Sequence, residues 1–164
     1  MATAAERRAM TVGIKELPAR LEAAVGGLSD AQLDEPGGEG EWSVRQVVHH
    51  MADAHMNGFI RMKLVLTEDK PILKPYDQEK WAELPDTTRA PLEPSMEILR
   101  GVHERWSTLL ESLSESDWQR QGVHLEAGLL TLDDLLSTFV RHGENHLQQI
   151  AKIRAAHRGS LDRA

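Results

Sequence analysis

Apolar residues recur every three or four positions along four stretches of the chain, and almost nothing alternates with the period of two that a half-buried strand requires. The four stretches are residues 14–28, 43–68, 95–113 and 132–153. Each is long enough to form a helix with one apolar face for packing against its neighbours. The pattern therefore predicts an all-α protein, built as a four-helix bundle.

Local signals place several helix ends. Ser43 is a predicted N-cap for the second helix. A pair of glycines at 26–27 supplies a stop for the first helix. Thr131 and Asp134 resemble a shortened capping arrangement at the start of the fourth. Because Pro18 interrupts the first stripe, we expect a kink or a late helix start there.

The second and third helices are joined by a long connection, residues 70–94, which contains five prolines. It leaves room for one short helix near residues 78–84. A connection of this length usually crosses the end of a bundle or covers a site as a lid. Farther along, residues 114–118 are expected to add a single turn and residues 121–130 a loop or an irregular hairpin.

Length, charge and cysteine content narrow the class. The 164 residues are expected to form one domain, 1–164, with a frayed tail after about residue 157. A formal charge of −7 argues against nucleic-acid binding. No apolar run approaches the roughly 18 residues of a membrane span, and the first residues lack the apolar core of a secretory signal, so a cytoplasmic location is expected. Since cysteine is absent, any metal must be bound by nitrogen and oxygen.

Two histidines, His142 and His146, interrupt the apolar stripe of the fourth helix. At about 100° per residue they project within roughly 40° of each other and toward the interior. A buried imidazole needs a partner, and two imidazoles one turn apart can share one cation. The pair therefore predicts half of a metal site. Glu144 projects roughly 200° away from His142, so the segment is not a zincin motif and brings no general base.

A third ligand is sought in the second helix, where the string VVHHMADAH contains three histidines. On a helical wheel His55 falls inside the apolar sector, and His49 falls on the side expected to face solvent. His50 lies at the edge of the apolar sector, beside Asn57 and Arg61. Periodicity favours His55 as the most buried, but the edge of a bundle helix can line a cavity. The wheel therefore leaves His50 and His55 level.

Three segments, taken together, resemble the DinB superfamily and in particular its YfiT-like branch. They are WSVRQVVHHMADAHMN at 42–57, KPYDQEKWAEL at 74–84 and the histidine pair at 142–146. The resemblance covers about residues 17–153. It implies a four-helix bundle in which three histidines, at one end of the bundle, hold a divalent metal ion, zinc or nickel. Carried over to this sequence, the ligands are His50, His142 and His146.

The same resemblance implies a metal-dependent enzyme acting on a small-molecule substrate. Members of this branch are labelled metal-dependent hydrolases, and some relatives are S-transferases that use a low-molecular-weight thiol such as bacillithiol, mycothiol or glutathione. No motif in this chain marks residues that contact a thiol. A homodimer is a further expectation from the resemblance.

Three imidazole ligands leave at least one coordination position open, which is typical of a catalytic site. That position can bind water and lower its pKa toward about 7, or bind a thiol and release its proton. The alternative is a non-catalytic scaffold that binds metal or forms a dimer. His55 in the second helix and His103 on the apolar face of the third are candidate pocket-lining residues, although a buried core histidine is the simpler interpretation of His103.

Overall fold

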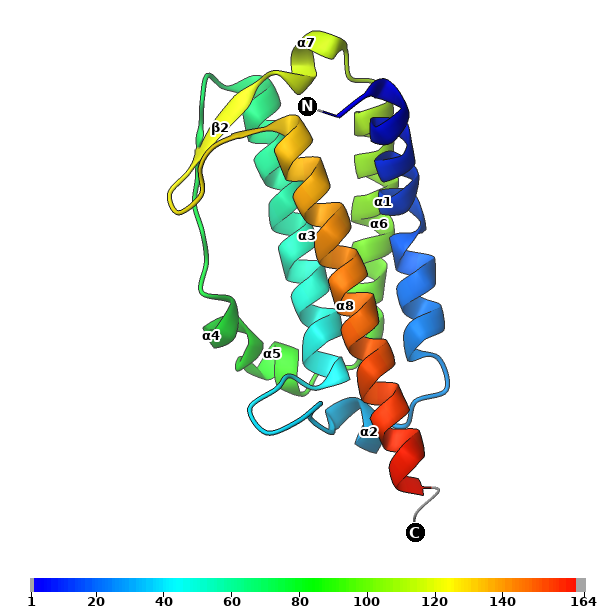
Figure 1. The fold of residues 1–164 in the computed structure, drawn as a ribbon. Helices are drawn as coiled ribbons and strands as arrows, with labels where there is room; N and C mark the ends of the chain where they lie inside the picture. The colour runs from blue at the N-terminus through cyan, green and yellow to red at the C-terminus, as the bar shows by residue number, and fades with distance from the viewer. Residues whose placement is uncertain (1, 162–164) are drawn as a thin grey trace.

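The computed structural model describes residues 2–161 (Figure 1). It contains the predicted four-helix bundle, whose long helices are α1 (Ala4–Val25), α3 (Val44–Thr67), α6 (Glu93–Glu111) and α8 (Leu132–Leu161). Helices α1 and α3 each pack against both α6 and α8, so α1 and α3 lie diagonally across the bundle. The fold class expected from the sequence is thus confirmed.

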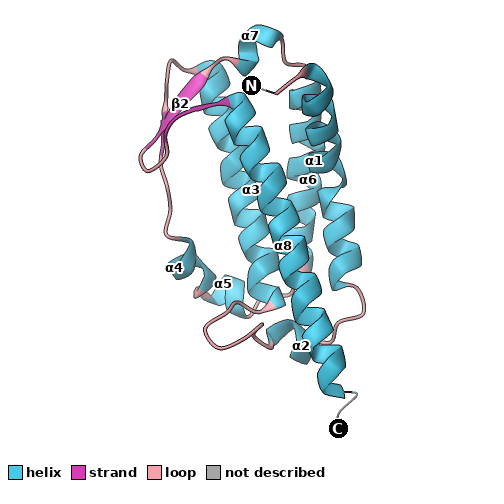
Figure 2. Ribbon diagram, in the orientation of Figure 1, coloured by secondary structure: helices cyan, strands magenta, loops and turns pink. Residues whose placement is uncertain are grey.

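Short elements decorate the ends and one side of the bundle (Figure 2). They are α2 (Asp30–Asp34), β1 (Ile72–Leu73), α4 (Gln78–Ala82), α5 (Pro85–Thr88), α7 (Glu115–Trp118), β2 (Gln121–His124) and β3 (Gly128–Thr131). Strands β2 and β3 form the expected hairpin, and β1 adds a parallel third strand beside β2. The sequence did not predict β1, because two residues are too few to show a period.

Most of the predicted helix ends are confirmed. The Ser43 hydroxyl accepts a hydrogen bond from the third residue of α3, and Gly26 is the C-cap of α1. Thr131 and Asp134 cap α8 reciprocally. The late start expected for the first helix is wrong, because α1 begins at Ala4 and runs through Pro18. Helix α6 begins and ends two residues earlier than expected.

Helix α8 continues past the predicted apolar stripe to Leu161. The structure does not describe residues 162–164 or the side chains of residues 157–161. The frayed tail expected after residue 157 falls in this part of the chain. In the range 2–161, none of the helices has the length and apolar content needed to cross a membrane.

The proline-rich connection runs along one side of the bundle. From the end of α3 the chain passes β1 and then α4 and α5 before it reaches the start of α6 at the opposite end (Figure 1). Both short helices pack against α3. The connection therefore covers one face of α3, the helix that carries His49, His50 and His55.

The apolar core is divided into two clusters. The hairpin-end core includes Met62, Trp106 and Leu136, whereas the α2-end core includes Val48 and Ile150. Four histidines, His55, His103, His142 and His146, lie between these two clusters along their helices, whereas His50 lies among the α2-end core residues of α3. The histidine layer therefore lies where the two cores meet, with His50 on the α2-end side.

Two glycines allow the helices to approach closely on both sides of this layer. A Cβ atom on Gly143 of α8 would lie 2.6 Å from the side chain of Leu17 in α1, and one on Gly58 of α3 would lie 2.5 Å from the ring of Phe139 in α8. A Cβ atom at either position would require the facing side chain, or the helix that carries it, to move. These contacts hold α8 close to α1 and α3 at the height of the histidines.

Candidate metal centre

Three imidazoles converge between α3 and α8. The Nε2 atom of His142 lies 3.0 Å from Nε2 of His50 and 3.2 Å from Nε2 of His146. All three rings can place a nitrogen within 4.8 Å of the other two. Zinc bound tetrahedrally at about 2.0–2.1 Å from each nitrogen would hold its ligands roughly 3.3 Å apart. The spacing of these three atoms therefore fits a metal ion of that size.

Burial keeps these rings neutral. It lowers the pKa of His50 to about 4 and that of His142 to about 3, and the neighbouring imidazoles lower both further. The pKa of His146 is also lowered by burial. Neutral imidazoles present one lone pair each, as metal coordination requires. A single Nε2 hydrogen on His142 could be shared with only one of the two facing nitrogens at a time, whereas a cation accepts all three lone pairs.

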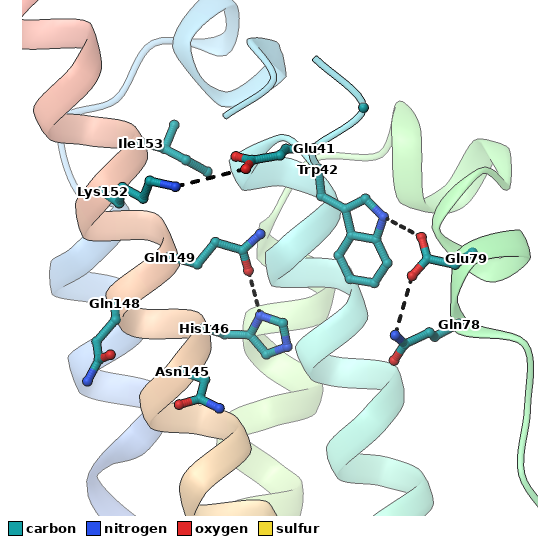
Figure 3. Close-up of a pocket in the computed structure, with 11 residues that line it drawn as sticks. Glu41, Trp42, Gln78, Glu79, Asn145, His146, Gln148, Gln149, Lys152 and Ile153 are labelled. Carbon is teal, nitrogen blue, oxygen red and sulfur yellow. Dashed lines mark hydrogen bonds and ion pairs between the residues drawn. The ribbon is translucent and has the colours of Figure 1, made fainter. Parts of the chain in front are cut away.

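The second ring nitrogen of each α8 histidine has its own partner. His146 Nδ1 lies 2.8 Å from the Gln149 side-chain oxygen, to which it donates (Figure 3). His142 Nδ1 lies 3.3 Å from Nε2 of His55. A hydrogen on Nδ1 leaves the lone pair on Nε2, the atom that points into the cluster. These contacts therefore orient both rings for coordination through Nε2.

Trp42 forms one wall of the cluster. Its indole packs edge-on against His50, with ring centroids 4.7 Å apart, and lies almost parallel to His146 at 6.5 Å. The indole N–H donates to the Glu79 carboxylate of α4 at 3.1 Å (Figure 3). The short helix of the proline-rich connection thus fixes the aromatic wall beside two of the three histidines.

Two cavities reach the cluster from the surface. A cavity of about 520 Å³ lies beside His146, and its lining includes Trp42, Gln78 and Gln149. A smaller cavity of about 190 Å³ lies beside His142, and its lining includes Arg61 and Gln78. Gln78, at the start of α4, borders both. The ligand cluster is therefore accessible to a small molecule from two sides of α4.

The structure separates the histidines that the wheel could not rank. His50 joins the cluster, whereas His55 lies behind it with no exposed surface, as its position in the apolar sector predicted. His103 is also buried, at 1 % exposed. Neither His55 nor His103 belongs to the lining of the two cavities beside the cluster. Both rings lie deeper in the bundle than the lining of these cavities, where the expected pocket-lining role would have placed them.

The expectation that His49 faces solvent is wrong. Its side chain is buried, with Nδ1 2.7 Å from the Ser95 hydroxyl and Nε2 3.1 Å from the Ala90 carbonyl. The connection that follows α5 covers this face of α3. The periodicity of α3 alone cannot reveal such a cover, because the covering segment lies about 40 residues later in the chain.

Glu144 points away from the cluster, as predicted. Its carboxylate forms an ion pair with Arg20 of α1, and both side chains are partly exposed. The sequence did not predict Trp42 or Gln149 as site residues. The available signals were Gln149 three residues after His146, on the same helix face, and Trp42 immediately before the N-cap Ser43.

A helical bundle with a three-histidine cluster between facing helices defines a class of metal-binding scaffold. The chain also matches the profile of the DinB superfamily over residues 14–150. It therefore belongs to the DinB superfamily.

Similar proteins include a Geobacillus thermodenitrificans protein that carries the provisional name metal-dependent hydrolase. It is 48 % identical over 145 residues, which cover 86 % of this chain and 80 % of the relative. YfiT from Bacillus subtilis, with the same provisional name, is 41 % identical over 141 residues, covering 85 % of this chain and 79 % of YfiT.

A solved structure of Bacillus subtilis YfiT has a fold similar to that of this chain. It matches with a TM-score of 0.93 and 37 % identity, and the match covers 96 % of this chain and 90 % of the YfiT chain. The description of that structure calls its four-helix bundle topology unusual.

Proposed function

We propose that this protein is a metal-dependent hydrolase of a small molecule, in which His50, His142 and His146 hold one divalent ion. The observation that carries the proposal is the convergence of three neutral Nε2 atoms, 3.0 and 3.2 Å apart, beside a cavity. The names of the Geobacillus and Bacillus relatives support the reaction class.

The donor set favours a particular kind of ion. Three imidazoles without a cysteine or a carboxylate suit zinc or nickel, whereas magnesium and calcium prefer oxygen ligands. Three protein ligands leave a position open on a four-coordinate ion. Such an ion supplies Lewis acidity, which lowers the pKa of a bound water toward about 7.

The protein side chains orient and enclose the site. Gln149 and His55 fix the direction of the two α8 ligands, and Trp42 closes the side next to His50. Both acidic residues that line the larger cavity have partners: Glu79 accepts from Trp42, and Glu41 lies 3.9 Å from Lys152.

The first experiment measures the metal content of untagged protein by plasma mass spectrometry. Wild type is expected to hold about one zinc or nickel per chain, and His50→Ala and His142→Ala little. His49→Gln is the matched control, because His49 is equally buried on the same helix but bonds to Ser95 and Ala90 instead. Wild type that neither holds nor takes up zinc or nickel would overturn the proposal.

The second experiment identifies the reaction. Metal-loaded protein is given a panel of small esters, amides and phosphoesters, with and without a low-molecular-weight thiol. Hydrolysis without thiol, lost in His142→Ala, is the expected result. Turnover only with thiol would identify the activity as that of an S-transferase rather than a hydrolase, since the open position also accepts a thiol. A metal-loaded protein that turns over nothing in either arm would be the non-catalytic scaffold.

A further inference from the structure

Two buried imidazoles behind the cluster have unmatched nitrogens. Among the described residues, His55 Nδ1 and His103 Nε2 are the buried side-chain polar atoms with no hydrogen-bond partner. The two rings lie against each other, with centroids 4.8 Å apart and planes inclined by 24°. Leaving buried polar atoms unpaired is costly, so two of them in adjacent rings require an explanation.

The hydrogen position on His103 follows from helix α1. Pro18 has no N–H, so it cannot donate to the carbonyl of Ile14, four residues earlier. His103 Nδ1 lies 2.5 Å from that carbonyl oxygen, which can only accept. Burial lowers the pKa of His103 to about 4, so the ring is neutral. His103 therefore carries its one hydrogen on Nδ1 and a lone pair on Nε2.

The hydrogen position on His55 follows from the ligand cluster. If His142 coordinates through Nε2, its hydrogen is on Nδ1, and that atom donates to His55 Nε2 at 3.3 Å. His55 has no exposed surface, and a buried neutral imidazole carries a single hydrogen. The hydrogen of His55 is then on Nδ1. The two unmatched atoms are thus one donor, on His55, and one acceptor, on His103.

We propose that His55 is a positioning residue for the ligand His142, and that His103 and the carbonyl freed by Pro18 anchor it. The inference rests on the proposed metal site. Four groups then form one directed series, from His142 through His55 and His103 to the main chain of α1, with every imidazole hydrogen on Nδ1. The donor of His55 and the acceptor of His103 thus belong to two rings that lie against each other.

This arrangement differs from the usual support of a metal-bound histidine, which is a carboxylate or a carbonyl in direct contact. Here the support is a neutral imidazole, and the carbonyl lies two rings away. Trp106 and Phe139 pack edge-on against His55, with ring centroids at 6.0 and 5.5 Å, and exclude water from it. Water therefore cannot replace His55 as the acceptor for His142.

The direct test is the tautomer of each histidine in zinc-loaded protein. Long-range proton–nitrogen correlation spectra of protein with ¹⁵N-labelled histidine report which ring nitrogen carries the hydrogen. His55, His103 and His142 are all expected as Nδ1–H tautomers. A His55 with its hydrogen on Nε2 would overturn the proposal, because it could not accept from His142.

Variants test the positioning role through zinc affinity, measured by competition with a chelator. His55→Leu removes the acceptor and is expected to weaken zinc binding by about 10–100-fold. His55→Gln keeps an acceptor and is expected to recover most of the loss, which a purely structural role would not predict. His49→Leu removes a buried histidine of the same helix that does not touch the cluster, and is expected to leave affinity unchanged.

Pro18→Ala separates positioning from folding. It restores an N–H that competes with His103 for the Ile14 carbonyl, and it removes a proline from a helix interior. The melting temperature of the metal-free protein is expected to rise, while zinc affinity falls several-fold. If the zinc affinity of Pro18→Ala stays at the wild-type value, the Ile14 carbonyl does not anchor His55 through His103.

The two proposals fail differently. Wild type that does not bind zinc overturns the metal site itself. Wild type that binds zinc through the three ligands, together with His55→Leu of equal affinity, overturns only the role of His55. If His55→Leu does not fold, the tautomer spectra and Pro18→Ala decide, because both use chains with His55 in place.

Discussion

Two polar clusters connect distant parts of this chain, and they differ in how their polar atoms are matched. The arginine cluster consists of Arg7, Glu115 and Asp133. Arg7 contacts both Asp133 oxygens at 2.7 and 2.8 Å and Glu115 at 2.7 Å, so that donors face acceptors. In the histidine cluster of His50, His142 and His146, by contrast, nitrogens face nitrogens.

This difference in matching distinguishes a cluster that stabilises the fold from one that can bind a ligand. The arginine cluster joins the start of α1 to the start of α8 and needs no further partner, since both buried charges are paired. Its hydrogen bonds raise the pKa of Arg7 and lower that of Asp133. In the histidine cluster, the proposed metal site needs three lone pairs that face one another, with every hydrogen on the other ring nitrogen. Such a cluster is matched by a cation and not by a further hydrogen-bonding group, and the following predictions test this contrast.

The largest expected effect is the acid sensitivity of the metal-free protein. The unfolded chain binds protons on histidine near the ordinary pKa of 6.5, whereas burial lowers the pKa of His50 and His103 to about 4 and that of His142 to about 3. Stability is therefore lost as the pH falls from 6.5 toward 4. At pH 5 each of these histidines contributes a loss of about 2 kcal/mol, or about 6 kcal/mol together, comparable to the whole stability of a domain.

Urea unfolding at pH values from 8 to 4 measures this loss. The arginine cluster acts in a different window: the lowered pKa of Asp133 adds stability that is lost only as the pH falls below its ordinary value of 3.8. The free energy of unfolding is thus expected to fall in two pH ranges, with the histidine range first as the pH is lowered. A free energy of unfolding that stays constant between pH 7 and pH 5 would contradict the assignment of these histidines as buried and neutral.

The next largest effect is expected from Arg7→Met. Removing the guanidinium leaves the carboxylate of Asp133, whose side chain is 6 % exposed, buried without its partner. A loss of about 3–5 kcal/mol in the free energy of unfolding at pH 7 is expected. Replacing Asp133 by Leu as well should recover most of it. Zinc affinity should stay unchanged, and a parallel fall in affinity would show that the two clusters are coupled.

Metal addition should act only on the histidine cluster. Free zinc at 100 times its dissociation constant stabilises the folded state by about 2.7 kcal/mol, which raises the melting temperature of a domain of this size by about 5–10 °C. The rise should be equal in wild type and Arg7→Met and absent in His142→Ala. Differential scanning calorimetry with and without chelator measures the rise in melting temperature. An equal rise in His142→Ala would show that the ion binds at another site.

The same contrast explains how much of the fold the sequence predicts. Four helices and several caps were predictable, because an apolar period of 3.6 over about 20 residues is a strong signal. The first ten residues of α1 were missed. Their inward-facing side chains include Arg7 and the hydroxyl of Thr11, which an apolar stripe cannot report. The arginine is buried only because Asp133, more than 120 residues later, pairs with it.

The site was predictable to a similar extent. The spacing of His142 and His146 on one helix is enough to predict them as ligands. The prediction of His50 depended on a family resemblance, because the helical wheel ranked it level with His55. Both residues are buried, but His50 lies in the cluster, whereas His55 lies behind it with Nε2 3.3 Å from Nδ1 of His142. The burial of His49 could not be predicted, since it depends on contacts with Ala90 and Ser95.

The smallest effect is expected from Gln149→Leu, which removes the acceptor for His146 Nδ1. Zinc affinity should fall by about 10-fold, at the low end for loss of a ligand's supporting partner. The loss should be smaller than that of His55→Leu, because Gln149 lines an open cavity and water can take its place, whereas His55 has no exposed surface. Gln148→Leu, which changes a neighbouring amide of the same cavity without a contact to His146 among those described, is the matched control. Chelator competition ranks the three variants, and a larger loss for Gln149→Leu than for His55→Leu would show that the exposed side of the cluster, rather than its buried side, controls the geometry of the ligands.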